Sequence, residues 1–129
     1  MLHYASMRMV FADDSDIVRT LIKRFLVEYD PSWEIVEAKT GREAMETTLT
    51  TKPDLVLLDI NRPDIQGTEV AKIIRESLPS AKIVLCSLGD SRDAMAAVKA
   101  CGADAYVSKV AAMEELHKTL AAVIGSSQK

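Results

Sequence analysis

Acidic, hydroxyl and basic side chains follow directly after apolar stretches at several points of this sequence. An Asp13-Asp14 pair follows the first stretch, Asp59 ends a later one, and Ser87 and Lys109 follow two more. Three carboxylates with an ordinary pKa near ~3.9 are ionised at neutral pH, so bringing them together is repulsive unless a cation lies among them. Hard oxygen ligands favour Mg²⁺, which also binds water and phosphate oxygens. These residue types therefore indicate a site that brings a phosphoryl group to a carboxylate.

Each of these side chains has a chemical role in such a reaction. Asp59 is the natural nucleophile, because it ends the central strand-like stretch, and a carboxylate that attacks phosphorus forms an acyl phosphate. Lys109 supplies a positive charge for the transferred group, and the Ser87 hydroxyl can donate a hydrogen bond to one of its oxygens. Taken alone, an Asp13-Asp14 pair before a helix is most often a helix cap.

Strand-like and helix-like segments alternate along the chain and position these residues. The segment 55–58 is continuously apolar, as expected of a strand covered on both faces. Five strands are predicted, at residues 8–12, 33–38, 54–58, 82–86 and 104–107.

The first predicted helix begins at a cap on Asp14 or Ser15. A stripe of apolar residues at helical spacing is expected to face the core: Ile17, Val18, Leu21, Ile22 and Phe25. The opposite face is expected to be solvated, and it carries Arg19, Lys23 and Arg24.

Four further helices are predicted from capping signals and apolar spacing. Thr40 and Glu43 have the spacing of a capping box, Pro79 stops the third helix, and Gly102 is placed to cap the fourth. Apolar residues line the last three helices: Val70, Ile73, Ile74 and Leu78 in the third, Ala94, Val98 and Cys101 in the fourth, and Met113, Leu116, Leu120 and Val123 in the fifth.

This alternation predicts a single doubly wound α/β domain, with a parallel five-stranded sheet and helices on both faces. In such sheets the functional crevice lies at the carboxyl ends of the strands, where the chemically interesting side chains fall.

Composition narrows the function further. The chain has 129 residues, 48% hydrophobic and 27% charged, with a net charge of −3. One globular domain is expected, without direct nucleic-acid binding. No apolar run approaches the ~20 residues that span a bilayer, and the N-terminus does not resemble a signal peptide. Cys86 and Cys101 have no metal-site spacing, so we expect buried thiols and a cytoplasmic location.

The ordered set of Asp13-Asp14, Asp59 with Pro63 and Gly67 after it, Ser87, and the segment 102–109 resembles the receiver domain of two-component response regulators, the CheY-like superfamily. The resemblance covers about residues 7–124. It implies a flavodoxin-like fold with strand order 2-1-3-4-5. The chain then divides into an N-terminal extension at 1–7, a receiver domain at 8–124 and a polar tail at 125–129.

The resemblance also implies roles for individual residues. Asp59 accepts a phosphoryl group from a phosphohistidine on a sensor histidine kinase or phosphotransfer protein. Mg²⁺, or Mn²⁺ in its place, is bound directly by Asp14 and Asp59, through water by Asp13, and by the main-chain carbonyl of Asn61. Lys109 contacts the phosphoryl group, and Ser87 with Tyr106 forms a switch pair, although an aromatic residue in a short strand often serves packing alone. Such a domain catalyses its own phosphorylation and dephosphorylation, and acts as a switch rather than as an enzyme.

Three positions depart from the common family pattern. Arg62 replaces an apolar residue and Leu88 replaces a smaller one, so both are candidates for modifying access to Asp59. Val110 replaces a common proline. Together with the segment 113–116, it makes this part of the sequence resemble NarL/LuxR-type receivers most. The expected output is a downstream protein or a C-terminal effector domain outside this sequence, with dimerisation on phosphorylation as a further expectation.

Two other functions remain open from the sequence. Asp14 and Asp16 follow an apolar strand as in haloacid-dehalogenase phosphohydrolases, where Asp14 would be the nucleophile. Alternatively, the chain is an interaction module with the receiver fold that signals without phosphorylation. Substitution of Asp59 distinguishes these functions, because only a phosphorylated receiver requires that carboxylate.

Overall fold

The predicted alternation of strands and helices is confirmed by the structure, a computed structural model that describes residues 7–60, 64–87, 91–108, 118–119 and 122–123. The described strands are β1 Arg8–Ala12, β2 Glu34–Ala38, β3 Leu55–Asp59, β4 Lys82–Ser87 and β5 Ala105–Ser108. The described helices are α1 Asp16–Tyr29, α2 Gly41–Thr51, α3 Gly67–Ser77 and α4 Ser91–Cys101.

The five strands form one parallel sheet in the order β2-β1-β3-β4-β5, as predicted. Every residue of β3 is buried, because the strand lies in the middle of the sheet and is covered on both faces. Because all neighbouring strands are parallel, their carboxyl ends lie at the same edge of the sheet.

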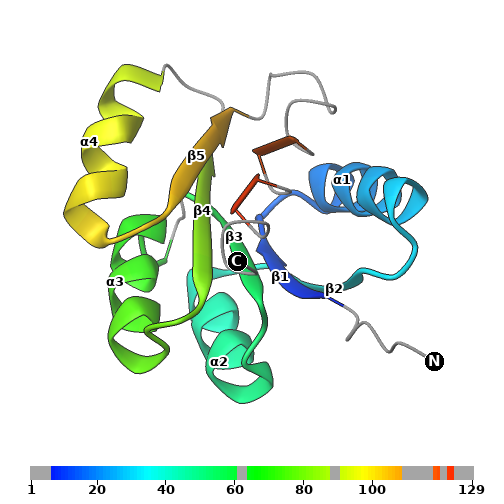
Figure 1. Cartoon of the computed structure of the whole chain (residues 1–129), viewed down its shortest axis with the longest axis horizontal. Helices are drawn as coiled ribbons and strands as arrows, with labels where there is room; N and C mark the ends of the chain where they lie inside the picture. The colour runs from blue at the N-terminus through cyan, green and yellow to red at the C-terminus, as the bar shows by residue number, and fades with distance from the viewer. Residues whose placement is uncertain (1–6, 61–63, 88–90, 109–117, 120–121, 124–129) are drawn as a thin grey trace.

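Helices cover both faces of the sheet (Figure 1). Helix α1 and the helical residues at 118–119 and 122–123 lie on one face, above a core that includes Phe11, Leu26 and Val123. Helices α2, α3 and α4 lie on the other face, above a core that includes Val56 and Ile74. Of the residues predicted to line a fifth helix, Val123 is buried, whereas Met113, Leu116 and Leu120 lie outside the described residues.

Helix α1 is rotated relative to the sequence-based expectation. Ile17 and Leu21, expected in the core, are 73% and 53% exposed, whereas Ile22 and Leu26 are buried. Conversely, the Arg19 side chain, expected to be solvated, is only 11% exposed. The helix therefore presents part of its apolar surface to solvent and turns a charged side chain inward.

The starts of α1 and α2 are capped by hydroxyl side chains. The Ser15 Oγ accepts a hydrogen bond from the Val18 amide at 3.2 Å, which identifies Ser15 rather than Asp14 as the cap of α1. The Thr40 Oγ1 accepts from the Glu43 amide at 3.0 Å, as predicted. The Glu43 carboxylate accepts from the Lys39 amide at 3.1 Å.

Helix α2 has a second, non-local cap. Two Asp64 carboxylate oxygens each accept a hydrogen bond at 3.0 Å, one from the Gly41 amide and one from the Arg42 amide. Burial acts to raise the pKa of Asp64, but hydrogen bonds from the backbone amides of Ile65, Arg42 and Gly41 outweigh it and lower the pKa to about 2. Asp64 thus ties the segment between β3 and α3 to the start of α2.

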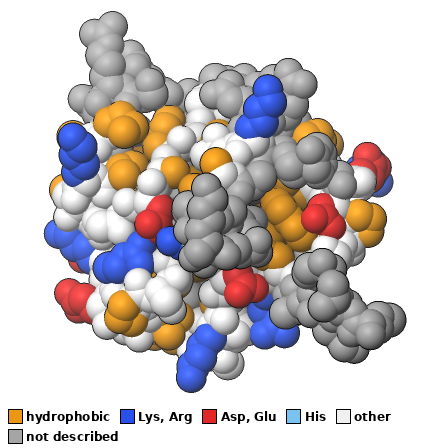
Figure 2. Space-filling model, in the orientation of Figure 1, with side chains coloured by type: hydrophobic (Ala, Val, Ile, Leu, Met, Phe, Trp, Pro, Cys, Tyr) orange, Lys and Arg blue, Asp and Glu red, His pale blue; other side chains and the backbone are white. Residues whose placement is uncertain are grey.

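Other local expectations agree with the structure. Gly102 ends α4 with a φ of +80°, which favours glycine, and Cys86 and Cys101 are both buried thiols. Basic, acidic and hydrophobic side chains are interspersed on the face drawn in Figure 2. Within the described part of the chain, helices lack the combination of length and apolar character needed to cross a membrane.

Candidate functional site

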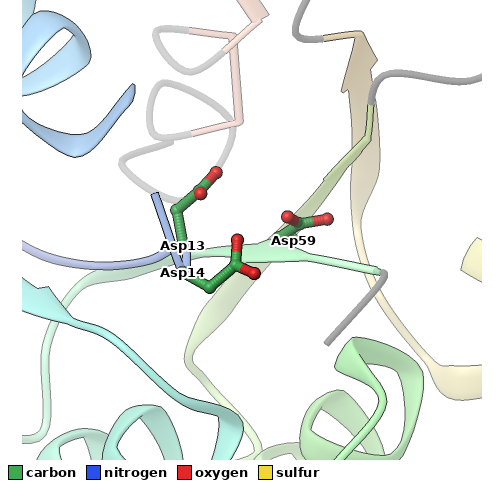
Figure 3. Close-up of side chains that lie close together, drawn as sticks. All are labelled: Asp13, Asp14 and Asp59. Atoms are coloured by element: carbon green, nitrogen blue, oxygen red, sulfur yellow. The ribbon is translucent and has the colours of Figure 1, made fainter. Parts of the chain in front are cut away.

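Three carboxylates meet at the carboxyl ends of β1 and β3. These strands are neighbours with Ala12 opposite Leu58, so the residues that follow them come side by side. One carboxylate oxygen from each of Asp13, Asp14 and Asp59 lies within 4.8 Å of the others (Figure 3). The structure therefore brings together three of the predicted site residues.

The burial of this cluster makes its charge costly. Asp13 is fully buried and Asp59 is 5% exposed, whereas Asp14 is exposed. Like charges at this separation and burial repel one another and lack full hydration, so a bound cation would relieve both costs. Carboxylates with open access on one side suit Mg²⁺, which retains water ligands. The donor set therefore fits the predicted metal ion.

Backbone contacts fix the position of Asp13. Its amide donates to the Ala38 carbonyl at 3.1 Å, which extends the pairing of β1 with β2 by one residue. Its carboxylate accepts from the Ser15 amide at 2.9 Å, at the start of α1. The Asp13 carboxylate is thus held at the junction of strand and helix.

Close backbone packing fixes the position of Asp59. The Ile60 amide donates to the Cys86 carbonyl at 2.9 Å, and the Gly67 amide donates to the Ile60 carbonyl at 2.9 Å. A Cβ atom on Gly67 would lie 2.3 Å from the Asp59 carbonyl oxygen. Glycine at position 67 therefore allows α3 to start directly against the end of β3.

Ser87 and Tyr106, the predicted switch pair, contact each other. Ser87 ends β4 and is 6% exposed, and its hydroxyl oxygen lies 2.9 Å from the Tyr106 hydroxyl oxygen, at hydrogen-bonding distance. The Tyr106 side chain also packs against the core beneath α2, α3 and α4. Asp59 is paired with Cys86 in the β3/β4 register, so Ser87 follows directly on the neighbouring strand.

The remaining predicted site residues, Asn61, Arg62, Leu88 and Lys109, lie outside the described residues. Their roles stay predictions.

Two residues near the site were not recognised from the sequence. Arg19 donates to the Asp13 carbonyl oxygen at 2.6 Å, and Asp64 caps α2 from the segment that follows Asp59. A sequence signal for Arg19 existed, because Asp16 precedes it at the spacing of a helical ion pair. The partners of Asp64 at the start of α2 are 22 and 23 residues away, beyond any local pattern.

Comparisons with known proteins agree with this architecture. The family model of the response regulator receiver domain matches residues 9–121. The chain is 39% identical over 114 residues to the uncharacterized transcriptional regulatory protein YhcZ of Bacillus subtilis, covering 88% of this chain and 53% of YhcZ. It is 35% identical over 104 residues to the chemotaxis protein CheY of Thermotoga maritima, covering 79% and 84% of the two chains.

A solved structure extends the comparison to three dimensions. The two-component response regulator of the LuxR family from Aurantimonas sp. SI85-9A1 superposes with a TM-score of 0.85 at 29% identity, covering 94% of this chain and 86% of that one. The chain belongs to the response regulator receiver domain family and is a receiver of two-component signalling. It spans about half the length of the transcriptional regulator YhcZ.

Proposed function

We propose that Asp59 accepts a phosphoryl group from a phosphohistidine on a sensor histidine kinase or phosphotransfer protein. An Asp59 carboxylate oxygen forms a bond to phosphorus while the bond between phosphorus and the histidine nitrogen breaks. The imidazole leaves with the bonding electron pair, and the product is an aspartyl phosphate. The chain catalyses this transfer to itself and acts as a switch.

The single observation that carries this proposal is the cluster of Asp13, Asp14 and Asp59 within 4.8 Å at the carboxyl edge of the sheet. A Mg²⁺ ion held by these carboxylates, and by the Asn61 carbonyl, would neutralise the charge that accumulates when a phosphoryl group approaches. Asp59 is the acceptor because it ends the central strand, whereas Asp13 is held by the start of α1.

Ser87 and Tyr106 transmit the modification. A phosphoryl group on Asp59 offers acceptor oxygens to the Ser87 hydroxyl and to Lys109, which changes the hydrogen bond between Ser87 and Tyr106. The phosphoryl group thereby biases an existing equilibrium between two arrangements of β5 and α4. The size of the bias equals the difference between its interaction free energies with the two arrangements. The output is an altered binding surface.

The exposed apolar side of α1 supports a docking surface for the phosphohistidine-bearing partner. Ile17 and Leu21 are 73% and 53% exposed on the helix whose first turn follows the Asp13-Asp14 pair. Apolar side chains exposed next to a reactive site are typical of protein contact surfaces. Downstream, the half-length match to YhcZ supports an effector domain beyond this sequence, with transcription as its output.

Mass spectrometry of the intact protein tests the acceptor. The chain is incubated with a small phosphodonor such as acetyl phosphate, with Mg²⁺ or with a chelator. We expect one phosphoryl adduct that requires Mg²⁺ and is absent from Asp59→Asn. Asp54→Asn is the matched control, because it removes the same charge just before the other end of β3.

Other outcomes would assign a different function. An Asp59→Asn variant that still acquires the adduct would refute Asp59 as the acceptor. If Asp14→Asn loses the adduct while Asp59→Asn keeps it, the nucleophile is Asp14 instead. A folded wild-type chain that stays unmodified with Mg²⁺ would favour an interaction module that works without phosphorylation.

A further inference from the structure

Arg19 connects three elements around the acidic site. It lies in α1, its side chain is 11% exposed, and its guanidinium reaches both the end of β1 and the edge strand β2. The Nη1 atom donates to the Asp13 carbonyl oxygen at 2.6 Å, and the Nε atom donates to the Glu37 carboxylate at 3.2 Å. The Nη2 atom pairs with the Asp16 carboxylate.

The carbonyl contact has consequences for the following residue. The Asp13 carbonyl and the Asp14 amide belong to the same planar peptide unit, so fixing one fixes the orientation of the other. The Asp13 amide is already held by Ala38, and its carboxylate is held by Ser15. Arg19 therefore restrains the peptide that carries Asp14, the exposed member of the acidic cluster.

The charge of Arg19 is balanced by neighbouring carboxylates. Burial acts to lower the pKa of Arg19, but the Asp16 and Glu37 carboxylates outweigh it and raise the pKa, so the guanidinium stays charged. Lys23 also binds Glu37, through the other carboxylate oxygen, at 3.2 Å. Lys23 shares the Glu37 partner of Arg19, and among the described contacts it does not bond to Asp13, so it is a natural control.

We propose that Arg19 is a positioning residue, which holds the Asp13-Asp14 peptide so that the three carboxylates are arranged for a divalent cation before it binds. Residues that orient metal ligands from outside typically contribute 10-fold to 100-fold to metal affinity. This inference rests on the proposed function, because it assigns Mg²⁺ to the cluster.

Calorimetric titration of Mg²⁺ into the metal-free chain tests the inference without a phosphodonor. We expect Arg19→Ala to bind Mg²⁺ about tenfold more weakly than wild type, and Lys23→Ala to bind as wild type does. Arg19→Lys should lie between, because lysine keeps the charge but lacks the planar fork. In the metal-free state, the Asp14 amide resonance should shift in Arg19→Ala and stay in place in Lys23→Ala.

Phosphorylation rates supply a second readout. With acetyl phosphate, Arg19→Ala should require about tenfold more Mg²⁺ for half-maximal rate, while its rate at saturating Mg²⁺ stays within about twofold of wild type. A general loss of structure would instead lower the rate at saturating Mg²⁺, and urea unfolding of each variant measures that loss directly. If Arg19→Ala does not fold, the comparison of Arg19→Lys with wild type decides.

The two proposals fail in different ways. If wild type binds Mg²⁺ and Arg19→Ala binds it as tightly as Lys23→Ala does, the inference is overturned and the acceptor role of Asp59 is unaffected. If wild type binds Mg²⁺ but acquires no phosphoryl group, the acceptor role fails and the binding comparison still judges Arg19. Absence of Mg²⁺ binding by the folded wild-type chain would overturn the inference and the metal assignment together.

Discussion

The hydroxyl oxygens of Ser87 and Tyr106 lie 2.9 Å apart, joining the end of β4 to the middle of β5. Either hydroxyl is able to donate in this pair. If the Tyr106 hydroxyl donates, the Ser87 hydroxyl can donate its own proton to an oxygen of a phosphoryl group on Asp59. The contact is therefore compatible with a phosphorylated site. In this arrangement the Tyr106 side chain already packs against the core.

A double-mutant cycle measures this contact. Ser87→Ala and Tyr106→Phe each remove one hydroxyl, and the double variant removes both. We expect a coupling of about 0.5 to 1.5 kcal/mol in the free energy of unfolding from urea titrations, the usual size of a neutral hydrogen bond. Purely additive effects would mean that the two hydroxyls do not stabilise each other in solution.

Gly67→Ala is expected to disturb Asp59, the proposed acceptor residue. The new methyl group would lie 2.3 Å from the Asp59 carbonyl oxygen and 2.9 Å from the Ile60 Cα, both backbone atoms that yield only if the end of β3 moves. We expect a loss of about 1 to 3 kcal/mol in unfolding free energy, together with slower phosphorylation by acetyl phosphate. Glu76→Ala, on the exposed surface of the same helix, is the control and should change neither quantity.

Asp64 is expected to give the stability a distinct acid dependence. Its pKa is lowered from 3.8 to about 2, so its contribution is present above 3.8 and is lost as the pH falls toward 2. The stability difference between wild type and Asp64→Asn should therefore shrink over that interval. Urea midpoints measured across the interval check this, with Glu46→Gln on the exposed surface of α2 as the comparison. A difference that stays constant through the interval would contradict the role of the carboxylate.

Lys52 offers a site for stabilisation. It caps the end of α2 with a φ of 48°, in the left-handed region that favours glycine. Lys52→Gly should raise the unfolding free energy by about 0.5 to 1 kcal/mol, after the greater freedom of glycine in the unfolded chain is included. Thr50→Gly, two residues earlier inside the helix, should lower it by about 0.3 kcal/mol, the difference in helix propensity between threonine and glycine. Thermal melting of both variants gives the sign.

Phosphotransfer from a protein donor should depend on the exposed side of α1. Leu21→Glu places a charge on the proposed docking surface without disturbing the core, because Leu21 is 53% exposed. We expect transfer from a phosphorylated histidine phosphotransfer protein to slow by about tenfold, the cost of one unfavourable contact in a small interface. The rate with acetyl phosphate should stay unchanged, and an equal loss with both donors would point to damage at the site itself.

The order of elements was predictable because strand-like and helix-like segments alternate along the chain, and the central strand is continuously apolar at residues 55–58. The rotation of α1 about its axis was not predictable from the sequence. Apolar residues at 17 and 21 and at 18, 22 and 26 form two overlapping stripes, and spacing alone does not choose between them. The choice is tertiary: Ile22 and Leu26 enter the core while Arg19 turns toward Glu37 and Asp13.

The candidate site also has a part that the sequence predicted and a part that it did not. The gathering of Asp13, Asp14 and Asp59 follows from their places after neighbouring strands, and the geometry agrees with that reasoning. The support from Arg19 and Asp64 depends on contacts between separate elements, which no local pattern encodes. The side chains proposed to carry the chemistry were therefore easier to find than those that contact them from other elements.

The ion pairs on β2 also bear on how this molecule behaves among its own copies. β2 is an edge strand, and an unpaired strand edge is a template on which another chain can add. Its exposed Glu34 and Glu37 are bound to Arg8 and to Arg19 with Lys23. An intermolecular sheet that grew from this edge would have to bring such charged pairs against their own copies, so the residues that brace the acidic site also discourage aggregation through the edge of the sheet.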